Sequence, residues 1–464
     1  MEQVEQPGLA VAEPSIIVPG VAAGSMAEAW RLAYPTVIGM FSATLMWTVD
    51  TILLGHVGKV PLAAAGFGGV LVWTLYTFFV GTVQGVNTFV AQAKGAGRPH
   101  DCALFAWQGL WVAVGATGLL ALLYWQMPRI LALAGPEAAV EAECLRYVRA
   151  RMLGAPFLLA TFAFHSFFRG VGDMKTPMVI VIIANLLNIG LDLLLIFGAG
   201  PVPALGALGA GLATSASDFS AALMGLALFL RPAVNAIYGS ARRAAAAFQP
   251  APLLRLLRVG APIGGQFFLD MGSFTIFMAI MGRLGTDELA ASQIGIQLLS
   301  FSFMPANGIS KAATTMVGQY LGAGRAALAA RCGWVTLRMN LVYSLVVAAV
   351  FLLARRHLFT LFNDDPGVVA AGLAIVPLLA IFQILDAVQM TFSNALQGAG
   401  DTRFPLLVIL LGSYVVFLPL ALLLAYRLEM GIVGGWLGEV VAFGLIASLL
   451  TWRFRAGRWQ SLRV

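Results

Sequence analysis

Four carboxylates lie deep inside long apolar stretches of this sequence, namely Asp50, Asp192, Asp270 and Asp386. A charged side chain at the centre of a bilayer costs about 2.5–3.5 kcal/mol even on insertion scales, so an intramembrane acid is functional by default. A buried carboxylate can bind a metal cation or a proton, because either one neutralises its charge. The sequence therefore predicts cation or proton sites within apolar segments.

The second of these acids belongs to a polar stripe. Asn185, Asn188 and Asp192 follow one another at spacings of three and four residues within "ANLLNIGLDLLLIFG". On an α-helix these spacings put all three side chains on one face. An amide oxygen beside a carboxylate supplies a neutral ligand for a hard cation, and hard cations favour oxygen ligands.

The depth of the first two acids in the membrane can be counted from a proline near the start of each span. Asp50 follows Pro35 by 15 residues, and Asp192 follows Pro177 by the same number. At 1.5 Å per residue both acids lie about 22 Å along spans that start on one side of the membrane. We therefore expect one cation or proton coupling site.

The residues predicted for this coupling site are Asp50, Asn185, Asn188 and Asp192, with Na⁺ held by Asp50, Asn188 and Asp192 if the ion is sodium. The alternative interpretation is that these groups only tie helices together through buried hydrogen bonds.

The other two acids lie in the second half of the chain and at a different depth. Asp270 follows Pro262 by eight residues, about 12 Å, and Asp386 precedes Gly398 by twelve, about 18 Å. Both positions are near the middle of the bilayer. We expect either ion coupling or contact with a cationic substrate there, and a hydrogen bond between helices is the alternative.

Three further residues are weaker candidates for a central cavity. His165 has a side chain that could titrate, although a packed core histidine is the more common case. Gln266 could line the cavity. Lys311 is the only lysine in the core of an expected span; it could pair with an acid, but we favour a side chain that extends to the interface.

The composition excludes a soluble protein. Of 464 residues, 60% are hydrophobic and 11% are charged, whereas a soluble domain carries about 25% charged residues. The net charge of +7 is explained by basic cytoplasmic loops rather than by nucleic acid. No HExxH motif or cysteine–histidine cluster is present in the sequence, so we expect no enzyme and no cofactor.

The apolar stretches are long enough for twelve helical spans. The first six are expected at residues 31–54, 61–92, 103–126, 142–168, 177–198 and 205–230. The second six are expected at residues 254–282, 288–318, 331–354, 367–396, 404–426 and 431–453. The fold class is therefore an all-α polytopic membrane protein.

The two sets of six spans repeat each other at a nearly constant offset. "TFVAQAKGAGR" (88–98) matches "TMVGQYLGAGR" (315–325) at an offset of 227, and "RGVGDMKTP" (169–177) matches "QGAGDTRFP" (397–405) at 228. Such a repeat indicates an internal duplication. Because each half has six spans, both halves enter the membrane from the same side, which predicts two six-helix bundles related by a pseudo-two-fold axis along the membrane normal.

The expected domain organisation follows from these spans. Residues 1–26 are predicted to be a disordered cytoplasmic tail, 27–230 the N-terminal bundle, 231–252 a cytoplasmic linker, 253–454 the C-terminal bundle and 455–464 a basic cytoplasmic C-terminus. Loops after even-numbered spans carry more Lys and Arg than loops after odd-numbered spans, so both termini are expected in the cytoplasm.

Several motifs in their order along the chain resemble those of one transporter family. They are "YPTVIGMFSATLMWTVDTILLGHVG" (34–58), "FFRGVGDMKTP" (167–177), "NLLNIGLDLLLIFG" (185–198), "VGQYLGAG" (317–324) and "DAVQMTFSNALQGAGDTRFP" (386–405). With these motifs the sequence resembles the multidrug and toxic compound extrusion (MATE) transporters over residues 27–459. The resemblance implies a secondary antiporter that exports organic, often cationic and amphipathic, compounds in exchange for Na⁺ or H⁺.

The resemblance also assigns individual acids. Asp50 matches the first-span acid of the family, and Asn188 with Asp192 matches the fifth-span motif of its DinF-like branch. Asp386, and Asp270 at a position where Glu is usual, resemble the NorM-like branch. The chain thus has features of both branches. It is expected to be a monomer in the inner (plasma) membrane, surrounded by lipid.

One other transporter class shares the two-bundle architecture. A lipid-linked oligosaccharide flippase would line its cavity with several arginines that bind pyrophosphate. Few arginines lie inside the expected spans away from their ends, and Arg338, near the start of the ninth, is one of them. The flippase therefore stays the alternative rather than the preferred interpretation.

Overall fold

The computed structural model describes residues 13–134, 138–198 and 200–462, and these residues are almost entirely helical. The helices of the first half are α1 (Met26–Val57), α2 (Lys59–Gly95), α3 (Pro99–Ala134), α4 (Ala138–Met152), α5 (Ala155–Gly170), α6 (Lys175–Phe197) and α7 (Ala207–Leu230). Two short helices follow, α8 (Pro232–Tyr238) and α9 (Arg243–Ala246).

The second half repeats this order. Its helices are α10 (Pro250–Gly282), α11 (Thr286–Gly322), α12 (Ala326–Leu353), α13 (Arg355–Thr360), α14 (Pro366–Ala399) and α17 (Gly431–Arg455), with the short η3 (Arg458–Ser461) at the end. Between α14 and α17 one continuous helix alternates between α-helical and π-helical geometry. Its parts are α15 (Arg403–Leu410), the π-helical η1 (Leu411–Phe417), α16 (Leu418–Leu422) and the π-helical η2 (Leu423–Arg427).

These helices give twelve membrane spans, in agreement with the sequence. Within the described residues, 11 helical segments are long and apolar enough to cross a bilayer. The twelfth span consists of α4 and α5, which are separated by a turn at Leu153–Gly154 and both pack against α2 and α7. The fourth expected span, 142–168, is thus a broken helix rather than a continuous one.

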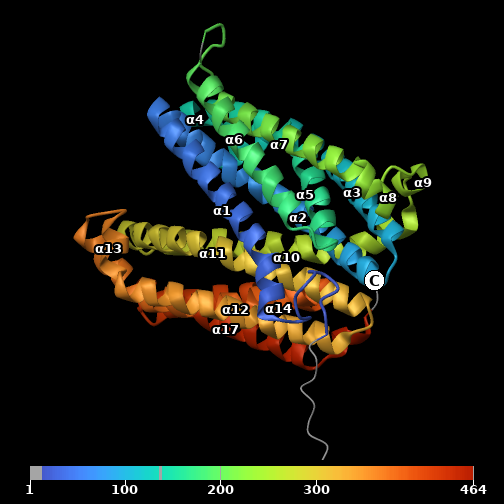
Figure 1. The fold of residues 1–464 in the computed structure, drawn as a ribbon. Helices are drawn as coiled ribbons and strands as arrows, with labels where there is room; N and C mark the ends of the chain where they lie inside the picture. Colours follow the sequence, from blue (N-terminus) through green and yellow to red (C-terminus); the bar gives the residue numbers. More distant parts are fainter. Residues whose placement is uncertain (1–12, 135–137, 199, 463–464) are drawn as a thin grey trace, which may run out of the picture.

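The two halves form two lobes that diverge from a common end (Figure 1). On the side of α4 and α13, which we call the open end, each lobe has a hydrophobic core of its own. On the side of α8 and α9, the closed end, one core contains residues of both halves, for example Leu32 of α1 with Met316 and Tyr320 of α11. Packing between the lobes is therefore concentrated at the closed end.

Glycines bring α2 and α10 into direct backbone contact at the closed end. Gly81 and Gly85 on α2 face Gly264 and Gly260 on α10. A Cβ atom at Gly81 would lie 2.6 Å from the Cα of Gly264, and one at Gly85 would lie 2.8 Å from the Cα of Gly260. Small residues spaced four apart allow this close approach of helices, whereas any larger side chain would separate the lobes.

The structure adds detail to two parts of the expected domain organisation. Residues 1–12 of the expected tail lie outside the described residues, but 13–25 fold against the closed end. Ser15, the backbone N–H of Gly24 and the hydroxyl of Tyr320 all donate hydrogen bonds to the buried Glu28 carboxylate. The expected linker, 231–252, contains α8 and α9. Trp107 and Trp111 on α3 donate hydrogen bonds to the carbonyls of Ser240, between these two helices, and of Ala246 on α9.

Candidate functional site

A pair of carboxylates occupies the interior of the first lobe, between α1 and α6. Asp192 is fully buried, Asp50 is partly exposed, and the two carboxyl groups lie close enough for the charge of Asp50 to act on Asp192. Asp50 and Asp192 follow Pro35 and Pro177 at equal spacing, and they lie side by side because α1 and α6 pack against each other. The structure brings these two predicted residues together.

The polar atoms around this pair have no protein partners. Oδ1 of Asp50, both carboxylate oxygens of Asp192, and both amide atoms of Asn188 are buried and form no hydrogen bond with any described residue. Buried polar groups in proteins are nearly always hydrogen-bonded, so each exception needs an explanation. A cation explains the unpartnered oxygens, and a proton shared between the two carboxylates explains part of them. We refer to Asp50, Asn188 and Asp192 as the acidic pocket.

Asn185 lies outside this pocket, one turn nearer the closed end. Its amide nitrogen donates a 2.7 Å hydrogen bond to the hydroxyl of Ser42 on α1. This bond holds α6 to α1 at the level below the two acids. For Asn185 the structure thus supports the alternative of a helix–helix hydrogen bond.

On the other side of the pocket, nearer the open end, the lobe interior is apolar. Leu54 and Ile196 stand one turn beyond Asp50 and Asp192 and pack with Ala65 and Ala210. This packing separates the acidic pocket from the open end of the lobe. The partly exposed Asp50 is therefore the member of the pocket that solvent can reach.

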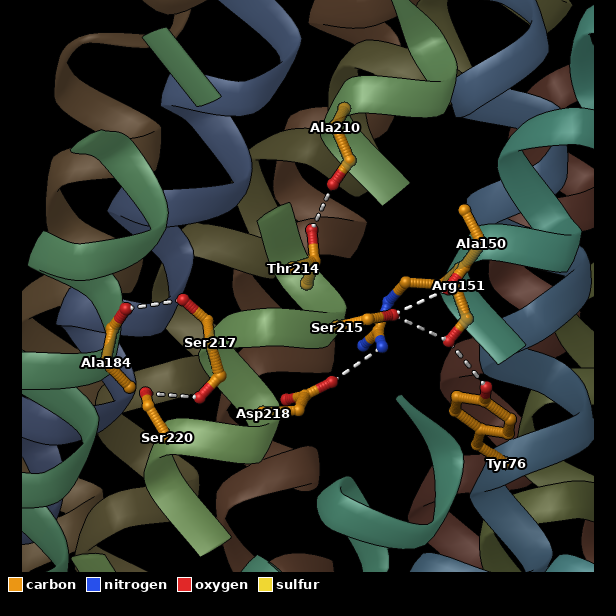
Figure 2. A network of polar contacts seen from close by, with 10 residues as sticks. All are labelled: Tyr76, Ala150, Arg151, Ala184, Ala210, Thr214, Ser215, Ser217, Asp218 and Ser220. Atoms are coloured by element: carbon orange, nitrogen blue, oxygen red, sulfur yellow. Dashed lines mark hydrogen bonds and ion pairs between the residues drawn. The ribbon is translucent and has the colours of Figure 1, made fainter. Parts of the chain in front are cut away.

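A third acid and an arginine form an ion pair beside the pocket (Figure 2). Nη1 of Arg151 lies 2.6 Å from Oδ2 of Asp218 on α7, and both side chains are largely buried. The charge of Arg151 also acts on Asp50. The first lobe therefore contains three carboxylates and one guanidinium close together. The guanidinium of Arg151 pairs with Asp218, which is not part of the acidic pocket.

The break between α4 and α5 places Arg151 at this position. Pro156, in the first turn of α5, has no N–H, so the carbonyl of Met152, four residues earlier, loses its helical donor. Next to it, the hydroxyl of Ser215 donates hydrogen bonds to the carbonyl groups of Ala150 and Arg151, at 2.7 and 3.3 Å, and the Tyr76 hydroxyl donates to Arg151 at 3.2 Å (Figure 2). The broken span is held by α7 and α2.

Asp218→Asn is expected to destabilise the protein, because the guanidinium of Arg151 would be left in the lobe without a counter-charge. Loss of one partner of a buried ion pair costs about 3–5 kcal/mol. Thermal unfolding of the purified protein in detergent checks this as a lowered midpoint. Glu143→Gln, which removes an exposed pair with Arg146, is the control, with an expected change within about 1 kcal/mol. Equal midpoints for the two variants would contradict a structural role of the Arg151–Asp218 pair.

The second lobe has its own group of acids. Asp270 on α10, Asp386 on α14 and Glu439 on α17 lie near enough for the charge of Asp270 to act on Asp386 and that of Asp386 on Glu439. Asp386 and Glu439 are buried, and Oε2 of Glu439 has no partner among the described residues. The structure thus brings the two predicted acids of this half together and adds Glu439.

Comparison with known proteins decides what kind of molecule contains these two acidic groups. The family described as MatE matches residues 35–194 and again residues 262–423. The chain belongs to the MATE family. Because the two matches begin 227 residues apart, each lobe of this MATE protein is one copy of the family unit. MATE proteins are membrane transporters and not enzymes.

Relatives of this MATE chain match it over nearly its whole length. It is 31% identical over 441 residues to a protein of Pseudomonas putida named "Probable multidrug resistance protein NorM", with 94% of each chain covered. A protein of the same name from Deinococcus radiodurans is 32% identical over 442 residues, with 92% of this chain and 95% of the relative covered.

Solved MATE structures have the same fold. A MATE protein in its straight conformation superposes with a TM-score of 0.85 at 20% identity, over 94% of this chain and 97% of the other. A structure described as the outward-facing conformation of a multidrug resistance MATE family transporter gives a TM-score of 0.84 at 20% identity, over the same shares.

The weaker candidates of this MATE transporter lie outside its two acidic groups. Both polar atoms of the Gln266 amide are hydrogen-bonded: its nitrogen donates to the carbonyl of Thr402, at 3.1 Å, and its oxygen accepts from Ser393 and Gln397, at 3.1 and 3.3 Å. It thus joins α10 to α14 and the following loop. His165 is buried in α5, and its Nε2 has no partner among the described residues.

Lys311 corrects the sequence-based expectation. It neither extends to the interface nor pairs with an acid; its side chain is 7% exposed, and Nζ donates a 2.9 Å hydrogen bond to Oε1 of Gln84 on α2. The physical reason is that α11 and α2 enclose this position at the closed end, where the lobes meet. Lys311 therefore contacts the opposite lobe.

Two charged residues near these sites, Arg151 and Arg169, are not among the residues predicted from the sequence. Arg151 falls nine residues inside the expected span 142–168, so its depth was a signal that could have marked it. For Arg169, at the end of an expected span, the sequence holds no such signal.

Proposed function

We propose that the protein is a secondary antiporter that exports organic, often cationic and amphipathic, compounds in exchange for Na⁺ or H⁺. The observation that carries this proposal is the acidic pocket, in which two adjacent carboxylates and an amide are buried without protein partners. An ion entering down its gradient binds there, and its free energy of entry drives the outward movement of substrate. The names of the NorM relatives support organic compounds as the exported class.

Alternating access requires that the cation binds the two conformations with different affinity. The helix that carries Asp50 provides a physical link between the pocket and the interface of the lobes. The first half of α1 packs against α11 so closely that a Cβ atom at Gly308 would lie 2.9 Å from the Cα of Val37. Neutralising Asp50 and Asp192 removes their repulsion, changes the packing of α1 on α6, and favours one arrangement of the lobes.

The acids of the second lobe are assigned to the substrate or to a second coupling ion. Asp270 is partly exposed, whereas Asp386 and Glu439 lie deeper. An organic cation attracted by three carboxylates would approach Asp270 first, and the surrounding apolar lobe would accept its hydrophobic part. This arrangement suits a permissive pocket for cationic amphipathic compounds.

The closed end is assigned to the cytoplasm, because the loops on that side carry most of the Lys and Arg. The described conformation is then outward-facing, and both termini are cytoplasmic. The protein is further proposed to act as a monomer in the inner membrane, with its lobes surrounded by lipid.

Reconstituted liposomes test the proposed exchange. Efflux of ethidium, a fluorescent organic cation, is followed after a Na⁺ gradient or a pH gradient is imposed separately. We expect one of the two gradients to accelerate efflux through the protein, and an ionophore that dissipates the same gradient to abolish the acceleration. Efflux that is independent of both gradients would contradict cation-coupled antiport.

A further inference from the structure

The closed end of the molecule is built from hydrogen bonds that repeat across the pseudo-two-fold axis. The hydroxyl of Thr88 donates to the carbonyl of Gln397 at 2.8 Å, and Thr315, its equivalent at an offset of 227, donates to the carbonyl of Arg169 at 3.1 Å. Likewise, Nε2 of Gln92 donates to Gly398 at 3.1 Å, and the equivalent Gln319 donates to Gly170 at 2.7 Å. The two lobes therefore close on each other as symmetric partners.

A small cavity lies on this axis and is lined by both lobes. Its wall contains two-fold equivalent positions in pairs: Gln84 with Lys311, Asn87 with Thr314, and Arg169 with Gln397. Its volume is about 10 Å³, which is room for one species of about the size of water. Flexible side chains form part of the wall, so a slightly larger atom fits after a small movement.

The charge of this cavity breaks the symmetry of its wall. At two of the three paired positions one lobe contributes a glutamine and the other a cation, Lys311 or Arg169. Within the described part of the chain no carboxylate lines the cavity, and neither cation forms an ion pair. The two positive charges therefore act on each other without compensation.

The two cations also have few other partners. Lys311 donates to the neutral Gln84, and its Nζ lies 5.7 Å from the centre of the Phe267 ring. Nε of Arg169 is buried and hydrogen-bonded to no described residue. Burying a charge is unfavourable unless it is paired with an opposite charge. A water molecule in the cavity would accept hydrogen bonds from the two cations but leave their charges uncompensated. An anion would accept the hydrogen bonds and also compensate the charge.

We propose that this axial cavity, between Lys311 and Arg169, binds a small monovalent anion that stabilises the closed end. The anion is either a free ion such as chloride or the carboxylate group of a transported compound. Because the wall comes from both lobes, the site exists only while the closed end is formed. Anion binding therefore stabilises this conformation relative to one in which the lobes separate here.

The internal duplication supplies the variants for a test. Lys311→Gln and Arg169→Gln each install the glutamine that already occupies the equivalent position of the other half, Gln84 or Gln397. The protein therefore already accommodates this side chain in the same wall. Arg243→Gln, on the exposed face of α9, removes the same charge far from the cavity and serves as the matched control.

The experiment measures the thermal unfolding midpoint of the purified protein in detergent, as sodium gluconate is replaced by sodium chloride at constant Na⁺ and ionic strength. We expect the midpoint of the wild type and of Arg243→Gln to rise and saturate with chloride. Lys311→Gln and Arg169→Gln should each lose this dependence. Equal midpoints in the two salts for the wild type, or an unchanged chloride dependence in both cavity variants, would overturn the proposal.

A second arm distinguishes the two sources of the anionic group. Efflux of a zwitterionic compound with a carboxylate is compared with efflux of ethidium, in gluconate buffer. If the substrate carboxylate is a ligand of the cavity, Lys311→Gln slows efflux of the zwitterion alone, and chloride competes with it in the wild type. If the ligand is a free anion, Lys311→Gln and chloride each change the efflux of the two compounds to the same extent. The unfolding arm needs no transport, so its result is independent of the proposed antiport.

Discussion

Asp192→Asn is expected to abolish the response of efflux to a cation gradient while leaving the protein folded. The substitution keeps the shape and hydrogen-bonding atoms of the side chain but removes one of the two charges of the acidic pocket. With one charge left, the pocket loses most of its preference for binding a cation in one conformation over the other. The coupling between two sites is typically worth about 1–3 kcal/mol, so gradient-driven ethidium efflux should fall about 5- to 150-fold.

Asp101→Asn is the matched control for this variant, because Asp101 is a partly exposed acid of the same lobe whose partner, Arg98, is exposed. Its efflux should equal that of the wild type, since surface pairs contribute little. The same amount of folded protein must be present in each liposome preparation, as shown by size-exclusion chromatography. Gradient-driven efflux of Asp192→Asn at the wild-type rate would mean that the pocket does not couple the cation.

Gly260→Val is expected to open the closed end. A Cβ atom at Gly260 would overlap the carbonyl oxygen of Thr82 on α2, and backbone atoms cannot rotate away as a side chain can. Overpacking of a close contact costs about 1–3 kcal/mol, which shifts the ratio of two conformations about 5- to 150-fold. Spin labels at the exposed positions Arg98 and Arg325, one in each lobe, should move apart as measured by electron–electron distance spectroscopy.

Gly118→Val provides the control, because Gly118 lies inside α3 and a Cβ atom there would meet nothing within 4 Å. The same label pair should report the wild-type distance in that variant. If the distance between the two labels in Gly260→Val equalled that of the wild type, the proposed role of the α2–α10 contact at the closed end would be contradicted. The lobes would then meet through contacts other than the α2–α10 glycines.

The sequence predicted the spans and the level of the first two acids well, because both depend on periodic and local features. Apolar length sets the spans, and a proline near the start of a span marks an origin from which helical rise can be counted. Asp50 and Asp192 therefore met as expected. The pattern did not separate Asn188 from Asn185, since both share the face of Asp192, and only the neighbouring Ser42 on α1 distinguishes them.

The remaining features depend on contacts between segments far apart in the chain. The break between α4 and α5 is stabilised by Ser215 and Tyr76, which lie on other helices. Arg151 is a buried group only because Asp218 faces it across the lobe. The same holds for Lys311, whose expected extension to the interface is prevented by the opposite lobe. Hydrophobic periodicity carries no information on such pairings.

The most direct test of cation coupling at the acidic pocket is the reverse experiment, in which substrate drives the cation. Liposomes containing the wild type are loaded with ethidium and diluted into dye-free buffer without any cation gradient, and entry of ²²Na⁺ or protons is recorded. Outward movement of the dye should drive one of these cations inward in the wild type and in Asp101→Asn, but not in Asp192→Asn. Cation entry in Asp192→Asn equal to that of the wild type, or none in the wild type while the dye leaves, would contradict the assignment of the coupling site to Asp50, Asn188 and Asp192.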